Sequence, residues 1–137
     1  NKHMAKGRDA HQARVNELNL FGKDLARRSG RKCELCEAQG VALKIFEVPP
    51  IPKSPDFDHC IFICETCNEQ INSPKQRDSD HWRCLAQTVW SEVDAIKALS
   101  MALLDAFATD WAQDTREIVF AEPDILEWAD KMKEELR

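Results

Sequence analysis

The sequence has no tyrosine, only four glycines and no long run of apolar residues. A membrane-spanning helix needs roughly 18 apolar residues in a row, and no segment approaches that length. Residues 1–7 lack the apolar stretch of a secretory signal peptide. Glycine-rich phosphate loops and serine–histidine–aspartate patterns are also missing. The sequence therefore predicts a chain with no membrane span and no common nucleotide-binding or hydrolase motif.

The composition suits a folded chain with an uneven charge. Hydrophobic residues make up 43% of the 137 residues, which is enough for one domain or for a small module packed against helices. Residues 1–32 hold nine Lys/Arg and three Asp/Glu, a net charge of +6, whereas residues 33–137 carry −11. An acidic body fits a DNA backbone poorly. The basic head could contact nucleic acid or an acidic partner, although a solvated helix face explains it more simply.

Two pairs of cysteines, each with two residues between them, stand out among the six cysteines. They are Cys33/Cys36 and Cys64/Cys67. In a reducing compartment this pattern indicates metal binding rather than disulfides. Four thiolates complete a tetrahedron around Zn²⁺ and leave no open position for a catalytic water, which predicts one structural zinc ion. Iron binding or a redox role is the less favoured alternative.

The segment around the cysteines, residues 31–74, is predicted to form a small ββα unit. Residues 41–48 have strand character, four prolines between residues 49 and 55 predict an extended loop, and residues 61–63 form a second short strand. A short helix should open at Cys67. This order describes a treble-clef or zinc-ribbon-like unit, which nucleases of the HNH class share. The end of the first strand carries Glu47 and Val48 rather than a catalytic histidine, so we expect no nuclease activity.

The remaining segments are predicted to be helical. Residues 1–8 are expected to be a tag remnant and a disordered start, and residues 9–30 one amphipathic helix that stops at Gly30. Residues 75–137 should hold three helices, over 82–108, 110–120 and from Pro123 onward. The predicted fold is mainly α: an N-terminal helix, a zinc module and about three C-terminal helices.

Four further residues could bind metal, namely His59, Cys60, His81 and Cys84. His81 and Cys84 would share one helix face, but two ligands do not make a stable site. We therefore expect a buried Cys84, a His81 at a helix start, and His59 and Cys60 near the zinc with a possible supporting role. The four tryptophans all fall at apolar helix positions, so core packing is favoured over an aromatic ligand cage.

The chain resembles the longer bacterial PhnA-type proteins, a family connected with alkylphosphonate-utilisation operons. The resemblance covers roughly residues 20–130. It is carried by residues 28–30 (RSG), 33–36 (CELC), 47–50 (EVPP), 64–67 (CETC), 69–71 (EQI), 81–85 (HWRCL), 90–93 (WSEV) and 111–113 (WAQ). It implies a cytoplasmic bacterial protein that binds zinc through the four cysteines, and it supplies no catalytic residues. Such proteins usually end in a small β-rich domain, which this sequence does not include.

The sequence thus favours a non-catalytic zinc module for protein interaction or regulation. One alternative is a nucleic-acid-associated protein that holds phosphates with Arg27, Arg28, Arg31 and Lys32. Another is an accessory protein or enzyme of phosphonate metabolism that uses His59 or His81. The apolar side chains of residues 82–108 predict a homodimer or a partner contact with Trp90 and Leu104 near its centre.

Overall fold

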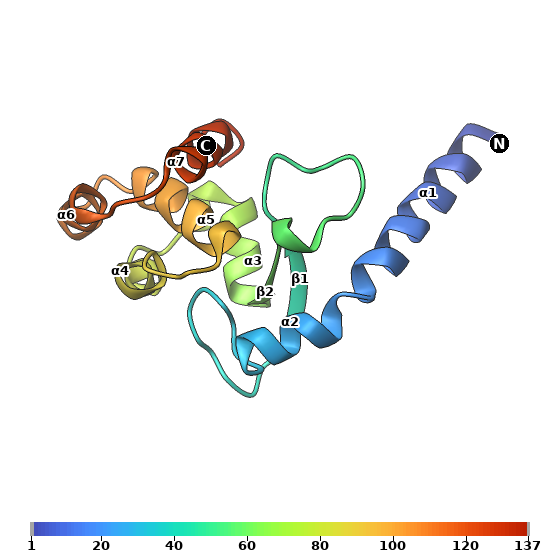
Figure 1. Ribbon diagram of the computed structural model, residues 1–137, viewed down its shortest axis with the longest axis horizontal. Helices are drawn as coiled ribbons and strands as arrows, with labels where there is room; N and C mark the ends of the chain where they lie inside the picture. Colours follow the sequence, from blue (N-terminus) through green and yellow to red (C-terminus); the bar gives the residue numbers. More distant parts are fainter. Residues whose placement is uncertain (1, 137) are drawn as a thin grey trace.

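The computed structural model describes residues 2–136, with side chains from residue 7 onward. The fold is mainly helical and has one two-stranded sheet in the described part (Figure 1). This confirms the prediction of a mainly helical fold with a small sheet. None of the described helices is long and apolar enough to cross a membrane.

The N-terminal segment forms two helices instead of one. Helix α1 spans Lys2–Asn19 and α2 spans Gly22–Ser29, so most of the start that we expected to be disordered is helical, while Asn1 lies outside the described residues. The helix breaks at Leu20–Phe21, where the backbone makes tighter hydrogen bonds to the third residue back. Asn19 and Gly22 flank the break, and both are weak helix formers. As predicted, Gly30 ends α2, in a left-handed conformation.

The sheet joins strands β1, Leu43–Glu47, and β2, Cys60–Cys64, in an antiparallel register. Leu43 lies opposite Cys64 and Glu47 opposite Cys60. The proline-rich loop of residues 48–59 connects them and ends in the short helix η1, Phe57–His59. Helix α3, Glu65–Asn72, follows β2 directly, two residues earlier than predicted. The predicted order of strand, loop, strand and helix is confirmed.

The C-terminal half contains more breaks than the sequence predicted. It comprises η2 (Pro74–Gln76), η3 (His81–Cys84), α4 (Leu85–Thr88), α5 (Asp94–Asp105), α6 (Asp110–Ile118) and α7 (Pro123–Met132). The single helix predicted over 82–108 is therefore wrong. At the break between α4 and α5, the Ser91 hydroxyl accepts a hydrogen bond from the backbone N–H of Val93, a local bond that competes with helix formation.

Buried side chains of the cysteine segment and of the helical half form one continuous core. It includes Ile61 and Ile63 of the sheet, Trp82, and Leu99 of α5. Helix α5 packs against both α6 and α7. Leu104 is also in this core, so it cannot lie at the centre of an exposed contact as predicted. Trp82 packs in the core as expected, whereas Trp90 is 49% exposed, which corrects the expectation for that tryptophan.

Candidate metal centre

Each cysteine pair forms a tight turn with its own internal hydrogen bond. Cys33 and Cys36 lie in the loop that follows α2, and the backbone N–H of Cys36 points to the Cys33 sulfur at 3.5 Å. In the second pair Cys64 caps the start of α3, and the Cys67 N–H points to the Cys64 sulfur, also at 3.5 Å. Both turns aim backbone donors at sulfur, which stabilises thiolates.

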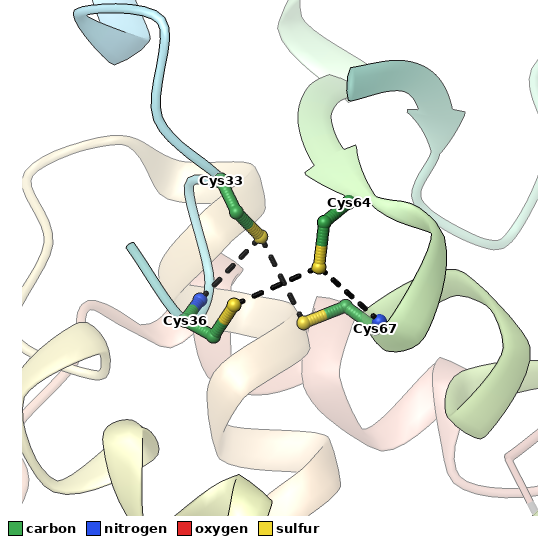
Figure 2. Close-up of side chains that lie close together, drawn as sticks. All are labelled: Cys33, Cys36, Cys64 and Cys67. Carbon is green, nitrogen blue, oxygen red and sulfur yellow. Dashed lines mark hydrogen bonds between the residues drawn. The ribbon is translucent and has the colours of Figure 1, made fainter. Parts of the chain in front are cut away.

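The four sulfurs converge on one point (Figure 2). All four Sγ atoms lie within 4.8 Å of one another, with Cys33 to Cys67 at 3.7 Å and Cys36 to Cys64 at 3.6 Å. A disulfide would bring two sulfurs to about 2.0 Å, so all four cysteines are free thiols. A regular tetrahedron with sulfurs about 2.3 Å from its centre has edges of about 3.8 Å. The cluster is therefore spaced to hold one metal ion.

The electrostatics of the cluster also fit a cation. The hydrogen bond between the sulfurs of Cys33 and Cys67 lowers the pKa of Cys33 to about 4 and raises the pKa of Cys67 far above its usual range. Burial raises the pKa of Cys36 to about 12. Thiolates this close repel one another unless a cation lies between them. A metal ion at the centre would hold all four as thiolates, and binding would release protons.

A buried ion pair fixes the first cysteine turn to the sheet. The side chain of Glu34 is only 3% exposed and accepts two hydrogen bonds from Arg28, at 2.9 and 2.8 Å. Its carboxylate also accepts the backbone N–H of Phe62 at 2.8 Å, and its own N–H donates to the Phe62 carbonyl at 2.8 Å. Glu34 thus connects α2, the Cys33–Cys36 turn and β2.

The helical half supports the same turn from the other side. The Thr88 hydroxyl of α4 donates to the carbonyl of Leu35 at 2.6 Å. Leu35, between the two cysteines, is fully buried in the core. The position of the cysteine turn therefore depends on its contacts with the helical half as well as on those with the sheet.

His81 and Cys84 lie beside the cluster and belong to its surroundings. The Nε2 atom of His81 is 3.2 Å from the Cys67 sulfur. A cavity of about 500 Å³ is lined by His81 and Cys84 together with Cys36 and Cys64. His81 starts η3, as predicted, and Cys84, which we expected to be buried, packs against the core but is only partly covered. Among the described residues only the four cysteines form a metal-binding group.

Replacing His81 with alanine should weaken metal binding about 10- to 100-fold, the usual effect of removing a hydrogen-bond partner of a metal ligand. With a metal ion bound, an Nε2–H of the imidazole would donate to the Cys67 thiolate, 3.2 Å away, and reduce the charge that this sulfur carries. A competition titration against a zinc chelator measures the effect. His59→Ala is the matched control and should leave the affinity unchanged. Equal affinities for the two variants would contradict this role of His81.

His59 and Cys60 lie away from the cluster, which corrects the expectation that they support it. Cys60 is at the opposite end of the five-residue strand β2 from Cys64, a separation of about 13 Å at 3.3 Å per residue. Its sulfur donates to the Asp56 carbonyl, and burial raises the pKa of its thiol to about 11. The His59 ring packs on Trp128, with ring centroids 4.5 Å apart.

Glu47, the last residue of β1, is held by an ion pair. Arg14 of α1 donates to both of its carboxylate oxygens, at 2.6 and 3.0 Å. The same guanidinium donates to the carbonyls of Pro52 and Lys53. Glu47 therefore connects α1 to the sheet.

No family model, curated protein or solved structure matches this chain. The chemistry of the centre therefore rests on the sulfur geometry and its surroundings. Sequence spacing was sufficient to find the four cysteines. It did not place His81 beside them, because the thirteen residues between Cys67 and His81 leave α3, pass through the short helix η2 and do not form one continuous helix.

Proposed function

We propose that the chain is a non-catalytic, zinc-dependent module for protein interaction or regulation, related to the PhnA-type proteins and acting in a reducing compartment such as the bacterial cytoplasm. The observation that supports zinc is the pair of sulfur separations, 3.6 and 3.7 Å, close to the edge of a zinc–thiolate tetrahedron. Zinc also tolerates a fixed tetrahedral set of thiolates without redox chemistry.

The role of the metal is structural, because four cysteine ligands fill the tetrahedron. No coordination position remains for a water molecule or a substrate. The ion instead joins the segment after α2 to the start of α3, two regions about 30 residues apart in the sequence. A module whose fold depends on such a joint provides a surface for other molecules rather than a reaction centre.

Elemental analysis of the purified protein should give one zinc per chain and little iron. Iron in place of zinc, with the visible absorption of iron–thiolate centres, would contradict the metal assignment.

Incubation with plasmid DNA and Mg²⁺, Mn²⁺ or Ni²⁺ should give no cleavage, because Glu47 is bound to Arg14 and no histidine occupies its position. Specific cleavage that Glu47→Ala abolishes would contradict the non-catalytic role.

The two alternative functions receive less support from the contacts. A phosphate-binding role for residues 27–32 relies on four basic side chains, and the guanidinium of Arg28 already binds Glu34. A phosphonate enzyme would need His59 or His81 in a reactive position. His59 packs on Trp128, and His81 contacts a cysteine of the cluster.

A further inference from the structure

An aromatic groove, distant in sequence from the four cysteines, is lined by residues of the α4–α5 and α6–α7 connections. Trp90 and Phe120 line a cavity of about 460 Å³, together with Ala121 and the buried Ile125. Phe120 is 87% exposed and Trp90 49% exposed. Large aromatic side chains left in water beside a depression mark contact surfaces.

Carboxylates surround this groove. Glu92, Asp94 and Glu122 line it, and an adjoining cavity shares Glu92 and Asp94 and adds Asp56 and Asp58. Within the described part of the chain, none of these five carboxylates has an ion-pair partner, as the ion pairs all involve other residues: Glu47, Asp24, Glu34, Glu65, Asp80, Asp105, Glu127 and Asp130. The groove therefore combines an apolar floor with an excess of negative charge.

Two basic residues, Arg28 and Lys97, lie near this surface, and neither forms an ion pair with these carboxylates in the described part of the chain. Arg28 lines the adjoining cavity but is bound to the buried carboxylate of Glu34. Lys97 lines the groove and holds its ammonium 5.7 Å from the centre of the Trp90 ring. This contact shows that the face of Trp90 accepts a cation, as aromatic faces do. A cationic side chain from another molecule would meet the carboxylates of Glu92, Asp94 and Glu122 beside this ring.

We propose that this groove binds a basic segment of a partner protein, in which one large apolar side chain is flanked by lysine or arginine residues. The apolar side chain packs between Trp90 and Phe120, and the flanking cations face Glu92 and Asp94. The segment then continues toward Asp58 in the adjoining cavity. Aromatic anchors within a charged rim are typical of binding surfaces of this size. This inference rests on the proposed role as an interaction module and names the class of its partner.

The probe for this surface is a fluorescein-labelled peptide, Lys-Arg-Leu-Arg-Lys, whose binding to the zinc-loaded protein is followed by fluorescence anisotropy. We expect saturable binding that weakens as salt is raised. Phe120→Ala and the double variant Glu92→Gln/Asp94→Asn should each weaken it about tenfold or more, as loss of a central contact does. A peptide with serine in place of leucine should bind about tenfold more weakly for the same reason.

The matched control is Glu69→Gln/Asp114→Asn, which removes the same number of charges from exposed sites outside the groove and should leave binding unchanged. Equal binding of the leucine and serine peptides, or equal losses in the two double variants, would show attraction by net charge alone and overturn the proposal. Preferential binding of duplex DNA at the groove would also overturn it.

Zinc is measured in every variant. If the protein holds one zinc ion per chain but does not bind the peptide, the groove proposal is rejected and the proposal of a zinc-dependent module is kept. If the peptide binds at the groove of a protein that holds no zinc, the zinc-dependent module is rejected and the groove proposal is kept.

Discussion

The double variant Cys36→Ser/Cys67→Ser should lose its metal and unfold throughout the described core. A structural zinc ion contributes on the order of 10 kcal/mol to a small metal-dependent fold. A domain of this size has a total stability of only about 5–15 kcal/mol. Because Cys33, Cys67 and Leu99 belong to one buried cluster, the loss of structure should reach the helices and not only the cysteine segment, residues 31–74. Circular dichroism and elemental analysis on the same sample measure both effects.

Cys84→Ser is the control for this variant. Cys84 lies beside the cluster and is also a thiol, but it is not one of the four residues that form the metal-binding group. It should keep one zinc per chain and unfold near the temperature of the native protein. Zinc retention in the Cys36/Cys67 variant, or unfolding like that of the parent protein, would rule out a metal-dependent fold.

Glu34→Ala should destabilise the protein by about 3 kcal/mol, the lower end of the cost of removing one partner from a buried ion pair. The lower end applies because the Arg28 side chain is 23% exposed and can partly rehydrate. The substitution also leaves the backbone N–H of Phe62 without this acceptor. Urea unfolding at a fixed excess of zinc measures the change in the free energy of unfolding.

An exposed ion pair in the same region provides the comparison. Lys44 and Glu65 are 3.1 Å apart, with side chains 48% and 58% exposed. Glu65→Ala should cost less than about 1 kcal/mol, as is usual for surface pairs. Similar losses in the two variants would mean that the Glu34 contacts do not hold the cysteine turn in place.

Local signals in the sequence were enough to predict the parts of the fold that depend on neighbouring residues. The paired cysteine spacing identified the four residues whose sulfurs converge. Strand-forming residues and the prolines between them located both strands to within one or two residues. Gly30 marked the end of α2 because a left-handed residue favours glycine.

Helix continuity was overestimated where the apolar pattern ran across a break. Residues 82–108 carry apolar side chains at helical intervals, yet the chain leaves the helix between Thr88 and Asp94. Ser91, three residues before Asp94, was the available signal, since serine hydroxyls compete for backbone N–H groups. The spacing of apolar residues predicts which side chains face the core. Whether these side chains lie on one helix or on two depends on the packing of the folded chain.

Long-range contacts were beyond the reach of sequence patterns. His81 contacts Cys67 across fourteen residues, and Arg14 contacts Glu47 across thirty-three. Arginine and glutamate are common on solvated surfaces, so the presence of Arg14 and Glu47 in the sequence does not indicate that they form a pair. Only the folded chain distinguishes Glu47, which is bound, from the exposed carboxylates around the groove.

The contacts of Arg14 divide α1 into two stretches of unequal stability. Beyond this residue toward the N-terminus, the side chains of residues 7–13 are all exposed, and α1 points away from the rest of the molecule (Figure 1). An isolated helix of roughly a dozen residues is marginal in water, and helix–coil exchange takes about 0.1–1 μs. We therefore expect the outer stretch to melt and re-form many times while Arg14 holds the inner stretch against the sheet. A molecule that approaches α1 from its N-terminal end would encounter helices of several lengths in exchange rather than one helix of fixed length.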